Sequence, residues 1–131
     1  MIAGKVTPNR EAVIEVEVSG PDQLQQEVDA VIDSGFNGYL TLPSYLVGSL
    51  NLPLAGNRRA TLGDGKAVVL DAYFATVTWH GQARDVLVLQ AEGGALVGMS
   101  LLYGSRVSME VIDDGDVVIE KLPSPTKDET E

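Results

Sequence analysis

Hydrophobic and polar residues alternate along most of this chain. In the run AVIEVEV, the side chains of Ile14, Val16 and Val18 fall on one face and two glutamates fall on the other. A period of two is typical of a β-strand with one buried face. The same alternation recurs at 73–79, 106–112 and 116–122. The run VLVL at 86–89 is apolar on both faces, so we expect it at the centre of a sheet.

Turn signals separate these segments, and helix is scarce. Asp114-Gly115 predicts a hairpin between the last two strands, and HGQ at 80–82 predicts another turn. Segment 42–52 predicts one short or distorted helix, because Gly48 interrupts it, and a helical turn should follow Gly98. Many short strands with frequent turns predict an all-β fold. We expect a closed barrel or sandwich of short antiparallel strands with one or two short helices.

Length and composition predict one soluble domain with a short tail. The 131 residues are 44% apolar, enough for a single core. The charged segment 123–131 has the composition of an acidic, disordered tail, so we place the domain at residues 1–122. No apolar stretch approaches the ~20 residues that span a bilayer, and no signal peptide is evident. The absence of cysteine permits a reducing compartment, so we expect a cytoplasmic protein without a membrane partner.

The charge of the chain argues against nucleic acid as a partner. Its 19 acidic residues and 9 basic ones give a formal charge of −10. Such a balance repels phosphate backbones, and no basic stripe with interleaved aromatics is present.

Several kinds of chemical site find no support in the sequence. His80, the only histidine, falls in a predicted turn, so we interpret it as an exposed turn residue rather than part of a catalytic triad. One histidine and no cysteine make a zinc site unusual. Segment 113–116 lacks the ligand spacing of a calcium loop, and segment 62–66 lacks that of a phosphate loop. We therefore expect neither a metal nor a cofactor.

One tripeptide stands out, Asp33-Ser34-Gly35, which lies between two apolar stretches. Aspartate and glycine both favour turns, so a plain β-turn is one interpretation. A carboxylate held for catalysis in a cleft is the other, because chains otherwise keep acids out of apolar sequence.

Three segments resemble the retropepsin-like (clan AA) aspartic peptidases, in particular the small bacterial type. VIDSGFNGYLTLP resembles the active-site segment of that family, and RRATLGDGKAVVLDAY lies where the family has its flap hairpin. VLVLQAEGGALVGMSLL, with Leu96-Val97-Gly98, resembles its second signature. Ser34 stands where threonine is commoner, and the flap tip carries an acid and a base. The resemblance covers most of the chain and implies an acid-protease half-fold.

The resemblance also implies an activity and an assembly. The family hydrolyses peptide bonds with a water held between two aspartates, and this chain has a single Asp-Ser-Gly. The resemblance therefore implies a homodimer that acts on peptides or proteins, with one Asp33 from each copy. It implies that Ser34 binds across to the partner copy, and that Gly35 lets a backbone N–H reach the carboxylate.

The resemblance assigns substrate binding to the flap. The flap residues that it indicates are Leu62, Gly63, Asp64 and Gly65. As apolar pocket walls we expect Leu62, Val68 and Val97.

Two other classes of function stay open at this point. A domain of the same fold that binds a peptide or partner without cutting it would keep the groove but not the reaction. A structural β-domain would keep Asp33 only as a turn residue.

Overall fold

The computed structural model describes residues 1–61 and 64–123, and this part of the chain contains ten strands and two short helices. The helices are α1 (Ser44–Ser49) and α2 (Met99–Leu102). The strands are β1 (Ile2–Val6), β2 (Ala12–Ser19), β3 (Gln25–Ile32), β4 (Leu40–Leu42), β5 (Leu54–Thr61), β6 (Ala67–Trp79), β7 (Gln82–Gln90), β8 (Ala95–Val97), β9 (Ser105–Met109) and β10 (Asp116–Lys121). Strands hold 56% of the described residues and helices 8%, so the all-β prediction is confirmed.

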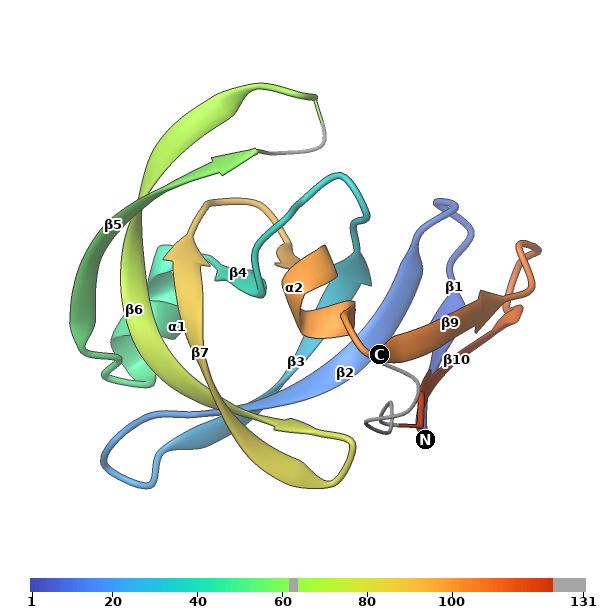
Figure 1. Ribbon diagram of the computed structural model, residues 1–131, viewed down its shortest axis with the longest axis horizontal. Coiled ribbons are helices and arrows are strands. Elements are labelled where there is room, and N and C mark those ends of the chain that lie inside the picture. The colour runs from blue at the N-terminus through green and yellow to red at the C-terminus, as the bar shows by residue number, and fades with distance from the viewer. Residues whose placement is uncertain (62–63, 124–131) are drawn as a thin grey trace, which may run out of the picture.

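Six of the strands close into a barrel (Figure 1). The sheet order is β5-β6-β7-β4-β8-β3-β2-β1-β10-β9, and an additional pairing of β6 with β2 closes the ring. β6 is long enough to do this because it spans 13 residues, so its end reaches β2 while its beginning pairs with β5. β1, β10 and β9 extend the sheet beyond the barrel.

Most strand pairs are antiparallel, as expected, but two pairs are parallel. β8 lies between β3 and β4, parallel to β3 and antiparallel to β4, and β4 runs parallel to β7. The expectation of purely antiparallel pairing was therefore incomplete. Strands joined by a tight turn must be antiparallel, whereas β8 inserts between strands from much earlier in the chain, and its direction is not fixed by a turn.

The barrel interior holds the residues that the alternation assigned to it. Ile14, Val16 and Val18 are at most 1% exposed, and Trp79 is buried with them in the main core. Segment 86–89 lies in β7, between β6 and β4, which confirms its central place.

The predicted turns and helices are present. His80 and Gly81, with φ of 50° and 75°, form the two-residue turn between β6 and β7. His80 is half-buried, not exposed as expected, because its Nε2 bonds with Ser105 Oγ at 2.8 Å. The hairpin at Asp114 joins β9 to β10, and α1 and α2 occupy the two predicted helical segments.

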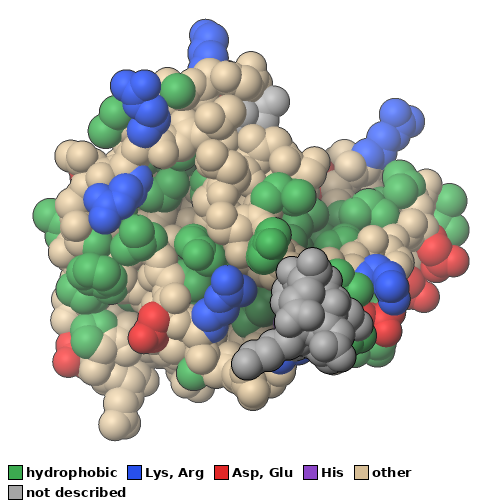
Figure 2. Space-filling model, viewed as in Figure 1, with side chains coloured by type: hydrophobic (Ala, Val, Ile, Leu, Met, Phe, Trp, Pro, Cys, Tyr) green, Lys and Arg blue, Asp and Glu red, His purple; other side chains and the backbone are tan. Residues whose placement is uncertain are grey.

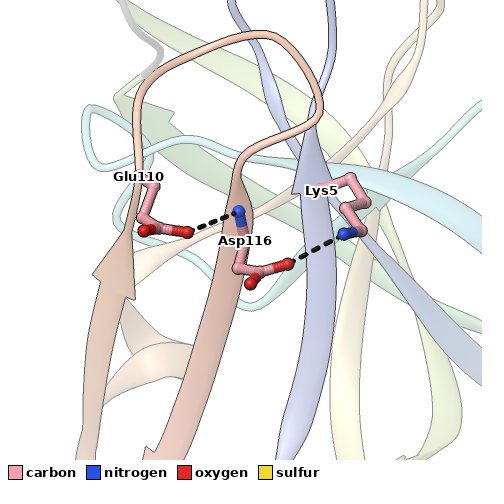
Figure 3. A network of polar contacts seen from close by, with 3 residues as sticks. All are labelled: Lys5, Glu110 and Asp116. Atoms are coloured by element: carbon pink, nitrogen blue, oxygen red, sulfur yellow. Dashed lines mark hydrogen bonds and ion pairs between the residues drawn. The ribbon is translucent and has the colours of Figure 1, made fainter.

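A small polar network fastens the sheet extension (Figure 3). Lys5 Nζ on β1 lies 2.8 Å from Asp116 Oδ1 on β10, and the Asp116 N–H donates to Glu110 Oε1 at 3.4 Å. The hydrogen bond and charge of Asp116 raise the pKa of Lys5. Both side chains of the pair are more than half exposed, so the pair adds little stability.

The last strand of the described chain, β10, ends at Lys121, and the domain boundary at residue 122 stays a prediction. The predicted tail falls mostly on residues 124–131, which lie outside the described residues. No helix in the described part of the chain is long and apolar enough to cross a membrane.

Candidate active site

Asp33 follows the last residue of β3 and begins a tight loop. Its N–H donates to Val97 O at 2.9 Å, which continues the parallel pairing of β3 with β8 by one residue. The Phe36 N–H then donates to Asp33 O at 3.1 Å, and the Gly35 N–H donates to Asp33 Oδ1 at 2.9 Å. The carboxylate is therefore oriented by the backbone of its own loop. Asp33 is half-buried, whereas Ser34 and Gly35 are exposed.

The residues at the start of α2 anchor this loop through hydrogen bonds. Residues 98–100 donate four hydrogen bonds to carbonyl oxygens of residues 36–39: Gly98 N to Tyr39 O at 3.0 Å, Met99 N to Phe36 O at 2.8 Å, Ser100 N to Gly38 O at 3.0 Å, and Ser100 Oγ to Asn37 O at 2.6 Å. The structure thus brings together two segments that the sequence analysis had singled out separately, Asp33-Ser34-Gly35 and Leu96-Val97-Gly98.

Gly98 is the residue that permits this close approach. A Cβ at position 98 would lie 2.3 Å from Gly38 O and 2.5 Å from Cδ2 of Phe36. Real side-chain carbons essentially never come so near another atom. Only glycine therefore fits where the second segment passes the loop of Asp33.

Phe36 connects the loop to the β5–β6 hairpin. Its ring is completely buried and forms a small second core with Ala60 of β5, Ala72 of β6 and Leu89 of β7. The hairpin is thereby packed onto the loop that carries Asp33. Sequence reasoning missed this residue, for which the only signal was weak: an aromatic residue directly after the glycine of the motif.

Arg84 of β7 is a second residue that sequence reasoning missed, and it contacts the loop. The Arg84 guanidinium lies 5.3 Å from the centre of the Tyr39 ring, and its two terminal nitrogens lie 3.4 Å from the carbonyl oxygens of Ser100 and Leu101. It therefore touches both the end of the loop and α2.

The predicted flap residues are only partly described. Asp64 and Gly65 form the exposed turn of the β5–β6 hairpin, where the Lys66 N–H donates to Asp64 Oδ1 at 2.9 Å. Leu62 and Gly63 lie outside the described residues.

The expected pocket walls differ from one another. Val68 is half-buried on the hairpin, whereas Val97 is 0% exposed inside the main core. The expectation that Val97 lines a pocket was therefore wrong, because its position in β8 directs the side chain into the barrel.

A groove with an apolar wall begins beside the loop. It has a volume of about 770 Å³ and is lined by Ser34 together with residues of α2, of β9 and of the turn between them, among them Met99, Tyr103 and Met109. These three side chains are 48%, 85% and 41% exposed, which is high for large apolar groups on one face.

The prediction that segment 106–112 has one buried face was wrong for the face beside this groove. Alternation at 106–112 predicted one buried face, yet Val107 is half-buried, Met109 is 41% exposed and Val111 is 68% exposed. The reason is that β9 is the edge strand of the sheet, with β10 on one side only. The apolar face exists, but in the single chain nothing covers it completely.

The chemical groups at this site are a carboxylate and backbone donors. In residues 1–61 and 64–123, no cluster of three acidic or histidine side chains could hold a metal ion. The site of one chain therefore offers one fixed carboxylate, Asp33, beside two exposed small residues.

Comparison with known proteins adds no further evidence. No protein-family model matches this sequence, and no curated protein matches it. The resemblance to retropepsin-like peptidases stays a prediction from the sequence.

Proposed function

We propose that this protein is a homodimeric aspartic endopeptidase, in which a water molecule between two Asp33 carboxylates attacks a peptide bond. The observation that carries the proposal is the anchoring of the Asp33 loop. The carboxylate accepts from the Gly35 N–H, and residues 98–100 bind the loop through four hydrogen bonds. The proposal includes the cytoplasmic location that a chain without cysteine permits.

The reaction follows from two carboxylates that share one water. Two carboxylates close enough to share one water cannot both be ionised, so the pair holds one proton. The ionised carboxylate takes a proton from the water while the oxygen of that water bonds to the carbonyl carbon of the peptide. The protonated carboxyl group of the partner copy donates a hydrogen bond to the carbonyl oxygen. The C–N bond then breaks as a proton passes to the nitrogen, which releases an acid and an amine and restores the shared proton.

A second copy is needed to supply the other carboxylate. The sequence contains one Asp-Ser-Gly, and a two-fold axis at this loop would bring two of them together. The exposed apolar face formed by Met99, Tyr103 and Met109 supports such an assembly, because it shares the groove of Ser34. In a two-fold interface the same surface patch of each copy packs against that of the other, so this apolar face would be buried against the same face of the second copy.

A second candidate is a domain that holds an extended peptide without cutting it. The edge position of β5 favours it, since a strand that is paired on one side only can add a peptide strand on its other side through backbone hydrogen bonds.

Cleavage of a broad peptide mixture between about pH 4 and 7 tests the proposal. We compare wild type with Asp33→Asn, and with Asp29→Asn as a matched control at an exposed position of β3, the strand that leads to Asp33. Mass spectrometry should find new peptide ends with wild type and Asp29→Asn but not with Asp33→Asn. Specific activity should also fall on dilution, as dimers separate.

Cleavage by Asp33→Asn equal to that of wild type would refute the proposal. A dimer that binds peptides and leaves all of them intact would establish the second candidate.

A further inference from the structure

Positive charge gathers on the β5–β6 hairpin of an otherwise acidic protein. Residues 54–73 carry three basic residues and two acidic ones, whereas the chain as a whole carries −10. Segment 12–32, which contains β2 and β3, has five acidic residues and no basic one. Blue side chains accordingly lie over β5 and β6 in Figure 2. The hairpin therefore repels an anionic ligand much less than the acidic segment 12–32 does.

The strand register sends the two adjacent arginines of β5 to opposite faces. Arg58 pairs with Leu70, and its neighbours on the same face include Ala60, which is buried against Phe36. Arg59 pairs with Val69, which is 63% exposed. Because side chains alternate along a strand, Arg58 lies on the face that packs toward the Asp33 loop, and Arg59 lies on the outer face.

The Arg58 guanidinium keeps most of its hydrogen-bonding capacity. Its Nη1 donates to Asn57 O at 2.7 Å, one of five N–H groups that an arginine offers. Within the described ranges 1–61 and 64–123, the only ion pair is Lys5–Asp116, so Arg58 contacts no carboxylate there. Arg58 is exposed, and it sits on the edge strand of the sheet, where a peptide can approach.

We propose that Arg58 makes the protein select peptides with an acidic side chain at one fixed distance from the cleaved bond. This inference rests on the proposed peptidase function. An extended peptide that pairs with the free edge of β5 presents alternate side chains to the same face as Arg58, so one position meets the guanidinium. The planar guanidinium matches a carboxylate through two parallel hydrogen bonds.

A paired peptide series tests the inference. Each peptide carries glutamate or glutamine at one position, which is moved stepwise away from the cleaved bond, and kcat/KM is measured for each pair. Wild type should favour glutamate by about three- to tenfold at one position, and the preference should shrink in high salt. Arg58→Gln should bring this ratio close to one. Arg59→Gln, the matched control with the same loss of charge, should keep it.

A second readout separates this inference from the proposed function. Binding of the same peptides to Asp33→Asn protein, followed by fluorescence anisotropy, reports selectivity without turnover. If no protein cleaves but the glutamate peptide still binds better and Arg58→Gln removes that advantage, the peptidase proposal fails, whereas the selection of an acidic side chain by Arg58 stands for the bound peptide. Equal binding and cleavage of the two peptides overturn the inference. Absence of any binding, or equal loss of the preference in Arg58→Gln and Arg59→Gln, also overturns it.

Discussion

Replacement of Gly98 by alanine is the most direct test of how the candidate site is built. The new Cβ would lie 2.3 Å from Gly38 O and 2.8 Å from Phe36 O, whereas ordinary contact begins at about 3.4 Å. Both nearest oxygens belong to the backbone, so no side chain can swing away to make room. The loop must therefore move by about 1 Å relative to α2.

The expected cost combines steric overlap with lost hydrogen bonds. Overpacking of a well-packed site costs about 1–3 kcal/mol. A shift of about 1 Å would also weaken the bonds donated by residues 98–100, each with a net contribution of about 1 kcal/mol. We expect Gly98→Ala to lower the free energy of unfolding by about 3 kcal/mol. Activity, where present, should fall by about 10²-fold, because catalysis tolerates little displacement of its groups.

Urea denaturation measures the stability effect. With a slope of about 2 kcal/mol/M, the midpoint should fall by about 1.5 M. Gly48→Ala is the matched control: a Cβ there meets nothing within 4 Å, and alanine favours the α1 helix by about 0.5–1 kcal/mol, so its midpoint should rise. A Gly98→Ala protein that unfolds at the wild-type midpoint would show that the close approach is wrong.

Three further changes probe the sheet and its charges. Thr41→Val should lower the free energy of unfolding by about 1–2 kcal/mol, because the buried Oγ1 accepts the Leu96 N–H at 2.9 Å, and Thr41→Ser should restore most of it in urea denaturation. A hydrogen bond with Glu27 and the charge of Glu27 raise the pKa of Glu15, so the folded state binds the Glu15 proton more tightly than the unfolded state does. The free energy of unfolding should therefore fall as pH rises above about 4.5, and Glu15→Gln should flatten this part of the melting-temperature profile. Burial lowers the pKa of His80, so stability should fall as pH drops below about 6.5, and His80→Asn, which tolerates the positive φ, should remove that slope.

The local elements of the fold could be predicted from the sequence, but the closure of the barrel could not. Alternation located β2, the second half of β6, and β10, because one face of each is buried in the main core. The insertion of β8 between β3 and β4 has no counterpart in any short stretch of sequence. It depends on contacts between residues far apart in the chain, which periodicity does not encode.

The candidate site was predictable only as two separate segments. The tripeptide at Asp33 and the glycine at position 98 could be picked out, but their contact arises from the four hydrogen bonds between residues 36–39 and 98–100. The role of Phe36 was hidden, since a phenylalanine after a turn is usually ordinary core. The exposure of Met109 was hidden as well, because alternation shows which residues share a face and not what covers that face.

The turn interpretation of Asp33 and the catalytic one are not exclusive in this structure. The Phe36 N–H does close a turn onto Asp33 O. A turn of this kind is stabilised by its own residues, however, and does not need bonds from residues 98–100. Those bonds are accepted by residues 36–39 and fix the loop that follows Asp33, while Ser34 and Gly35 stay exposed. They stabilise the fold under either interpretation. The catalytic interpretation needs their rigidity in addition, because reacting groups must be held within about 0.5 Å of their productive geometry.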